Sequence, residues 1–214
     1  FIHEIFKNAD PKSLAMTGES NVTYGQLEKA VENYRNTLYA MGIRRGDTVG
    51  LYTANRAEFV YVYMAVVSLG AIIVPINNSL VDREVDFILR DAESKLLISD
   101  MPLTVSVPCI DIHDLDYRAS TENAPKAPAF PEDLTEDDVC ALIYTSGTTG
   151  SPKGAMITHK NQVRNVEQYT SVVPFNPEDK VLCVLPMFHC YGLTTVVLGS
   201  LYHHSTIVIL RSKS

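Results

Sequence analysis

The chain has 214 residues, of which 46% are hydrophobic and 20% charged, and its formal net charge is −7. This composition is typical of a globular protein with a buried core, and the length allows one large domain or two small ones. No basic run exceeds Arg44-Arg45, which argues against a nucleic-acid-binding surface. The four cysteines show neither a disulfide pattern nor zinc-ligand spacing, which predicts a reducing compartment. They are Cys109, Cys140, Cys183 and Cys190.

The two ends of the sequence and one apolar segment bear on targeting. Residue 1 is Phe, and no basic segment precedes an apolar run, so we expect no signal peptide and a chain that is part of a longer protein. Residues 59–76 carry no charge, as a membrane-spanning helix would require. Gly70 and Pro75 interrupt this segment, and β-branched residues follow the glycine. We therefore predict a buried helix and a buried strand instead.

The first elements are predicted from turn and capping signals. Residues 13–17 and 22–24 flank a polar turn and predict a hairpin. Thr23 and Gln26 have the spacing of a capping box, and apolar residues at helical spacing follow them. Gly42 then provides a left-handed stop, so a long helix is expected between these signals.

Two further capping signatures predict the starts of helices. They are Asn55 with Glu58, and Ser79 with Asp82. Short apolar strands are expected around these helices, at residues 48–53, 71–74 and 95–99. Strands thus alternate with helices along the chain. Within each strand the residues are continuously apolar and do not alternate between apolar and polar. This pattern predicts an α/β fold with mainly parallel sheets and helices on both faces.

Residues 113–138 interrupt the alternation, because they are rich in proline and acidic residues and show no period. We predict an exposed connection there rather than an acidic binding surface, since charge runs are usually solvated. A buried strand is expected at 139–145. The helices and strands predicted after it lie near 159–171, 180–185, 192–202 and 206–210.

Residues 144–154 read Tyr-Thr-Ser-Gly-Thr-Thr-Gly-Ser-Pro-Lys-Gly. The glycines permit close backbone approach, so that successive N–H groups can surround an anion. The hydroxyl groups can donate to phosphate oxygens, and Lys153 adds a positive charge. A strand before the segment and a helix expected soon after it suit a phosphate-binding loop. Counting from Gly147, Pro152 stands where a Walker A loop needs glycine, which argues against that class.

In isolation this segment could be an ordinary polar loop, but its residue order resembles the signature of the adenylate-forming (AMP-binding) superfamily. That superfamily includes acyl-CoA synthetases, coumarate–CoA-like ligases, luciferases and the adenylation domains of peptide synthetases. Residues 23–27, 42–49 and 69–77 resemble other patterns of the family, with Gln26 and Leu69 in place of the usual Glu and Ala. The resemblance covers the whole chain and implies part of the large N-terminal domain of an acyl-CoA-synthetase-like enzyme.

Residues 185–193 resemble the family motif that lies closest to the acyl substrate. The resemblance places His189 and Tyr191 at the acyl pocket or its gate, whereas an isolated histidine would more often be a satisfied core residue. Amino-acid-activating relatives have an Asp after the Phe of this motif. His189 offers no fixed negative charge at neutral pH, which favours a fatty or other acid without an α-amino group.

The resemblance implies ATP-dependent formation of an acyl-adenylate, followed by transfer to CoA as a thioester. It assigns the nucleotide phosphates to Thr145, Ser146, Gly147, Thr148, Thr149, Gly150 and Lys153. The family's magnesium ligand and catalytic lysine come later in sequence, so no catalytic residue or metal ligand is expected within residues 1–214. We expect the isolated chain to bind nucleotide weakly and to catalyse neither step.

Two alternatives remain open from the sequence. One is a non-catalytic nucleotide-binding or scaffold remnant of the same fold, and the other is an adenylation domain that loads a carrier-protein thiol. The expected partners are a carboxylic acid, ATP with Mg²⁺, and CoA, with no nucleic acid and no transmembrane segment. A cytoplasmic location is expected, with peripheral membrane association as a variant, and the sequence predicts no oligomeric state.

Overall fold

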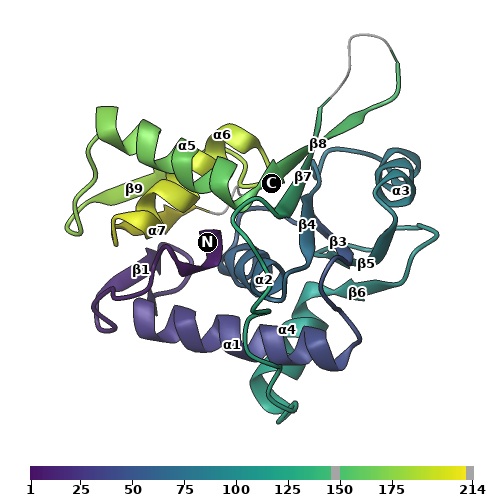
Figure 1. Cartoon of the computed structure of the whole chain (residues 1–214), viewed down its shortest axis with the longest axis horizontal. Helices are drawn as coiled ribbons and strands as arrows, with labels where there is room; N and C mark the ends of the chain where they lie inside the picture. Colours follow the sequence, from purple (N-terminus) through teal and green to yellow (C-terminus); the bar gives the residue numbers. More distant parts are fainter. Residues whose placement is uncertain (146–149, 211–214) are drawn as a thin grey trace.

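The computed structural model describes residues 1–145 and 150–210, whose strands form two sheets flanked by helices (Figure 1). The larger sheet has the order β6-β5-β3-β4-β7-β8, and the smaller has the order β2-β1-β10-β9. The strands of the larger sheet are β3 (Thr48–Tyr52), β4 (Ile72–Pro75), β5 (Ser94–Ser99), β6 (Cys109–Asp111), β7 (Val139–Thr145) and β8 (Lys153–Thr158). Those of the smaller sheet are β1 (Leu14–Thr17), β2 (Val22–Thr23), β9 (Lys180–Cys183) and β10 (Thr206–Ile209).

Most neighbouring strands are parallel. In the larger sheet β6, β5, β3, β4 and β7 run parallel, and only the edge strand β8 is antiparallel to its neighbour. In the smaller sheet β1, β10 and β9 are parallel, and β2 returns from β1 as the predicted hairpin. The predicted α/β class with mainly parallel sheets is therefore confirmed.

Helices cover both faces of the larger sheet (Figure 1). The helices of the described chain are η1 (Ile2–Glu4), α1 (Tyr24–Ala40), α2 (Ala57–Ser68), α3 (Asp82–Asp91), α4 (Ile112–Thr121), α5 (His159–Val172), α6 (Cys190–Gly192), the π-helical turn η2 (Leu193–Leu198) and α7 (Gly199–Tyr202). Of these, η2 and α7 pack against β9 and β10 of the smaller sheet. Residues of α1 and α2 share one core with Val49 and Ile73 of the sheet. On the opposite face, Leu89 of α3 packs in a second core with Val74 and Leu97.

The uncharged segment 59–76 forms the buried helix α2 and the strand β4, as predicted. Phe59, Val60 and Val66 are fully buried against neighbouring elements, so the apolar surface that suggested a membrane span is covered by protein. Within the described parts of the chain, no helix is both long enough and apolar enough to cross a bilayer.

Only one of the three capping predictions is confirmed. At α1, the backbone N–H of Gln26 donates to the Thr23 hydroxyl (3.2 Å), and the side-chain Oε1 of Gln26 accepts from the Thr23 N–H (2.9 Å). Helix α2 instead begins after Arg56, with no side-chain cap. Helix α3 begins after Val81, whose N–H donates to Glu84 Oε2 (3.0 Å). The predicted caps fail because both asparagine and serine lie too early in the loop.

The prediction of a structureless connection over 113–138 is wrong in its first part. Strand β6 and helix α4 occupy residues 109–121, and α4 packs against α1. Ile112, Leu115 and Ala119 are buried, so a short helical period was present among the acidic residues. From 122 to 138 there is no helix or strand in the described structure, although Ala127 donates its N–H to Asn36 Oδ1 (2.8 Å).

Candidate functional site

The glycine-rich motif lies on a β-hairpin that projects from the body of the molecule (Figure 1). Strands β7 and β8 are antiparallel, and Thr145 at the end of β7 pairs with Lys153 at the start of β8. The helix expected near 159–171 is present as α5, but the strand β8, which the sequence did not predict, lies between the motif and this helix. The predicted phosphate-binding residues at 146–149 (Ser146, Gly147, Thr148 and Thr149) lie outside the described residues.

Tyr144 ties the loop end of this hairpin to α3. Its hydroxyl donates to Asp91 Oδ2 of α3 (2.6 Å), and its ring lies against Gly154, its cross-strand partner. Burial, together with the Asp91 carboxylate, raises the pKa of Tyr144, so the hydroxyl stays a neutral donor at physiological pH. The hairpin is thus held to α3 by a hydrogen bond across the larger sheet's edge.

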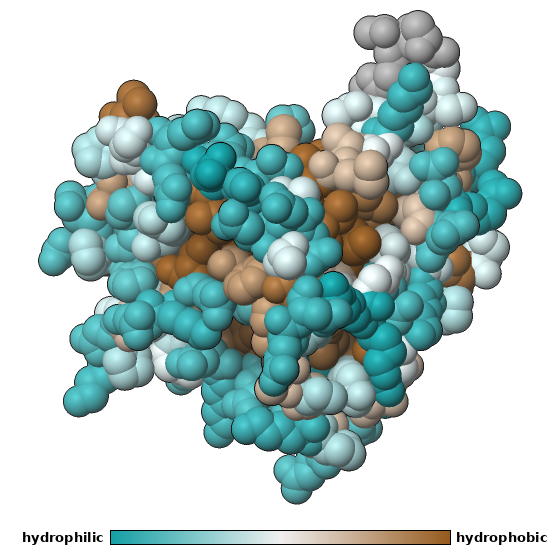
Figure 2. Space-filling view, viewed as in Figure 1, coloured by the Kyte–Doolittle hydropathy of each residue, from teal (hydrophilic) through white to brown (hydrophobic). Residues whose placement is uncertain are grey.

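A cavity of about 790 Å³ opens beside the hairpin. It is lined by β7 and the hairpin residues Thr145 and Gly150, by α3, by the segment after β4, and by Phe188 and His189. Figure 2 shows apolar side chains in a hollow near β7, with hydrophilic surface around it. Two motifs that are separate in sequence therefore meet at one cavity, as a nucleotide and acyl site would require.

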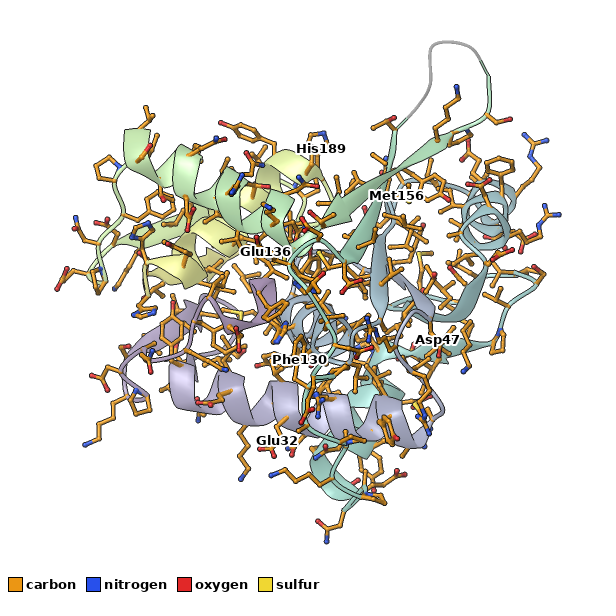
Figure 3. The ribbon with its side chains drawn as sticks, viewed as in Figure 1. Glu32, Asp47, Phe130, Glu136, Met156 and His189 are labelled. Carbon is orange, nitrogen blue, oxygen red and sulfur yellow. The ribbon has the colours of Figure 1, made fainter. Side chains whose placement is uncertain are left out.

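His189 is exposed and lies at the start of α6, on the side of the molecule that faces β8 and Met156 (Figure 3). Its Nδ1 accepts from the N–H of Tyr191 (3.2 Å), so the ring caps this short helix. His189 is thus not a buried core histidine. The lining of the cavity, as far as the chain is described, includes His189 and Cys190 but not Tyr191, which is 57% exposed.

The turn before His189 is tightly packed. The N–H of His189 donates to the Pro186 carbonyl (3.1 Å), and a Cβ added to Gly192 would come within 2.4 Å of that same oxygen. Only glycine fits at this approach without a shift of the backbone. The sequence 186–192 therefore folds into a compact turn that presents Phe188 and His189 together.

Sequence reasoning missed Asn55. Its side chain does not cap α2 but bonds to the backbone of Leu185 and Met187, next to the His189 turn. The one available signal was its position directly after a parallel strand, where ligand-binding residues of α/β folds gather.

A charged cluster supports the loop that carries Asn55. Arg56 Nε donates to Glu58 Oε2 (3.0 Å), and Arg56 Nη2 lies 3.2 Å from His113 Nε2. Burial alone would raise the pKa of Glu58, but the hydrogen bond and charge of Arg56 outweigh it and lower that pKa. A second cavity of about 470 Å³ adjoins the cluster. Because Arg56 is already paired with acidic groups, we assign the cluster a structural role.

The described residues include no group of three or more His, Cys, Asp or Glu side chains that could hold a metal ion. The cavity beside the hairpin is lined by the cationic side chains of Arg83 and Arg90, by the Thr145 hydroxyl and by one carboxylate, that of Glu84.

Comparison with known proteins assigns the chain to a family. Residues 5–214 match the family described as AMP-binding enzyme. The chain belongs to this family. It is 34% identical to the long-chain-fatty-acid–CoA ligase FadD13 of Mycobacterium tuberculosis, over 84% of the chain and 38% of the relative. It is 32% identical to 4-coumarate–CoA ligase 3 of Arabidopsis thaliana, over 91% of the chain and 38% of the relative.

Solved structures of AMP-binding enzymes have the same fold. The O-succinylbenzoate coenzyme A synthetase MenE of Bacillus subtilis, in complex with AMP, superposes with a TM-score of 0.87 at 29% identity, over 100% of this chain and 56% of that one. The inhibitor-bound N-terminal domain of FACL13 from Mycobacterium tuberculosis gives 0.88 at 29% identity, over 99% and 57%. The fold is therefore that of the N-terminal domain of adenylate-forming enzymes. The chain spans about two fifths of the length of the curated relatives named above.

Proposed function

We propose that the full-length protein uses ATP to convert a carboxylic acid into an acyl-adenylate and then transfers the acyl group to the thiol of CoA. Membership of the AMP-binding enzymes and similarity to CoA ligases support this activity. The observation that carries the proposal is the convergence of the glycine-rich hairpin and the Phe188–His189 turn on one cavity. The hairpin supplies groups suited to phosphate, and the turn supplies a surface suited to an acid.

In the first half-reaction a carboxylate oxygen attacks the α-phosphorus of ATP, and pyrophosphate leaves with the broken P–O bond's electrons. The obstacle is charge, since two unit anions about 4 Å apart repel by ~4 kcal/mol at an effective dielectric of 20. Lys153, the Thr145 hydroxyl and the Gly150 N–H are proposed to hold the β- and γ-phosphates and to offset this repulsion. The same assignment is proposed for residues 146–149.

In the second half-reaction the CoA thiol sulfur attacks the acyl carbon, and AMP leaves. No residue of this chain is assigned to that step. The Mg²⁺ implied by the resemblance would take its protein ligand from outside the described residues, and no step is derived through it.

The proposed substrate is a fatty acid or another acid without an α-amino group. Phe87 and Phe188 give the cavity apolar surface, and His189 brings no fixed negative charge to pair with an ammonium group. Fatty acid metabolism and a cytoplasmic location, with peripheral contact to membranes, are part of the same proposal.

The test is acid-dependent exchange of labelled pyrophosphate into ATP by the full-length protein, across aliphatic, aromatic and amino acids. We expect exchange with one of the first two classes, and formation of acyl-CoA once CoA is added. Absence of exchange with every acid would contradict the proposal and favour a non-catalytic nucleotide-binding role. Exchange without acyl-CoA formation would instead indicate a carrier-protein thiol as acceptor.

A further inference from the structure

The side chain of Asn55 joins the two sheets. Asn55 lies in the loop at the carboxyl end of β3, in the larger sheet, whereas residues 185–187 follow β9 of the smaller sheet. Asn55 Nδ2 donates to the carbonyl of Leu185 (2.9 Å), and Asn55 Oδ1 accepts from the N–H of Met187 (2.7 Å). The two bonds lie on either side of Pro186, which has no N–H of its own. One carboxamide thus satisfies both polar backbone groups that flank the proline.

The loop that carries Asn55 is itself anchored. The N–H of Ala54 donates to Asp100 Oδ2 (2.8 Å), at the end of β5. On the other side, Arg56 is buried, with its guanidinium bonded to Glu58 (3.0 Å) and close to His113 Nε2 (3.2 Å). Asn55 therefore lies between two anchored residues, Ala54 and Arg56, and its side chain has a fixed position.

The segment that Asn55 holds, residues 185–187, leads directly to two residues that line the cavity. Met187 is buried, and the next two residues, Phe188 and His189, line the cavity beside the hairpin. The N–H of His189 donates to the Pro186 carbonyl (3.1 Å). The orientation of the Phe188 and His189 side chains therefore depends on the position of the 185–187 backbone. Displacing this backbone would move the Phe188 ring and the His189 imidazole together, without moving β7 or β8.

We propose that Asn55 is a positioning residue, which fixes the 185–187 backbone so that Phe188 and His189 form the acid-binding side of the cavity. The expected kinetic effect rests on the proposed function, whereas the two hydrogen bonds of Asn55 belong to the fold and do not depend on it. Asn55 lines the second cavity and not the one beside the hairpin, and no hydrogen bond joins it to the described residues of β7 or β8. Its loss should therefore weaken binding of the acid while binding of ATP stays unchanged.

The experiment compares Asn55→Ala and Asn55→Asp in the full-length protein. The Ala variant removes both hydrogen bonds, and the Asp variant keeps an acceptor for Met187 but places an oxygen against the Leu185 carbonyl. We expect the acid KM to rise about tenfold in the Ala variant, with the ATP KM within about twofold of the original. The Asp variant should also raise the acid KM, because donation to Leu185 is lost.

Asn36→Ala is the matched control, because the Asn36 side chain also accepts a loop N–H, that of Ala127, at 2.8 Å but far along the chain from the site. We expect it to affect stability and to leave the acid KM unchanged. An acid KM that is unchanged in Asn55→Ala, or raised equally in Asn36→Ala, would overturn the proposal.

Amide hydrogen exchange provides a readout that does not need activity. In Asn55→Ala, residues 185–191 should exchange faster, while residues 139–145 of β7 exchange as before. If the original protein activates no acid, the proposed function fails, yet this measurement still decides whether Asn55 holds the turn. Unchanged exchange at 185–191 would show that it does not.

Discussion

The ring of Tyr144 covers Gly154 on the neighbouring strand, so closely that a Cβ built on Gly154 would lie 2.8 Å from Tyr144 Cζ. The glycine that ends the motif is therefore a packing requirement of the hairpin. Since the ring is also tied to Asp91, it has little freedom to move aside.

Replacement of Gly154 by Ala should destabilise the hairpin by about 1–3 kcal/mol, the usual cost of overpacking. The affinity for ATP should fall as well, because Tyr144, which is bonded to Asp91 of α3, would have to move. Chemical denaturation and nucleotide titration of the full-length protein measure the two effects. In a double-mutant cycle, Tyr144→Leu should relieve part of the Gly154→Ala penalty, and strict additivity would contradict the packing explanation.

Replacement of Lys153 by Ala should slow pyrophosphate exchange by about tenfold or more, the usual consequence of losing a hydrogen bond to a charged group. Thioester formation from preformed acyl-AMP should be less affected, because the β- and γ-phosphates have already left. Lys29→Ala, on the outer side of α1, is the charge-matched control. Equal losses in both half-reactions would remove the assignment of Lys153 to the phosphates.

The role of His189 at the cavity can be separated from its role as a helix cap. His189→Asn keeps an acceptor for the Tyr191 N–H, whereas His189→Ala removes it. If the imidazole contacts the acid, both variants should change the acid KM or the preference among acids, by about fivefold or more. If only the Ala variant changes them, His189 acts through the cap alone. The ATP KM serves as the internal control.

A pH dependence of stability should come from His159, which is 1% exposed and accepts the N–H of Ile2 on Nδ1 (3.2 Å). Burial lowers its pKa to about 4, against about 6.5 in an unfolded chain. Above pH 6.5 the imidazole is neutral in both states. Between pH 6.5 and 4 the unfolded chain binds a proton that the folded protein excludes, so stability falls as the pH is lowered.

His3 acts in the same direction, since burial and then His159 lower its pKa to about 3. The slope from His159 alone reaches about 1.4 kcal/mol per pH unit. Denaturant unfolding of the original protein and of His159→Leu, at several pH values from 7.5 to about 4.5, measures it. The variant should be less stable at pH 7.5 but should lose less stability on acidification, and parallel curves would contradict this origin.

The sequence predicted those parts of the fold that depend on local signals. The Thr23–Gln26 capping box and the uncharged segment 59–76 were enough to predict α1, α2 and β4. Helix α4 was missed because acidic residues and the prolines further on obscured the short period of Ile112, Leu115 and Ala119. Strand β8 was missed because Pro152 directly precedes it and Gly154 is its second residue, and neither residue type favours a strand. Its pairing with β7 stabilises it instead.

The sequence predicted the two motifs of the candidate site but not that they line one cavity. The glycine-rich motif and the motif around His189 could each be recognised from their residue order. Their meeting at one cavity depends on how two sheets are placed relative to each other, which no local pattern of residues determines. Asn55 shows the same limit, because no local pattern of residues indicates its long-range contact with Leu185 and Met187.

The smaller sheet has a consequence for biosynthesis. Its central pair joins β1, near the amino terminus, with β10, and the Thr206 hydroxyl donates to the Leu14 carbonyl 192 positions away (2.9 Å). On a ribosome, β1 and β2 therefore emerge long before the strand that completes their sheet. The edge of β1 that pairs with β10 stays unpaired until the strands of the larger sheet have been synthesised, and an unpaired strand edge is prone to pairing with other chains.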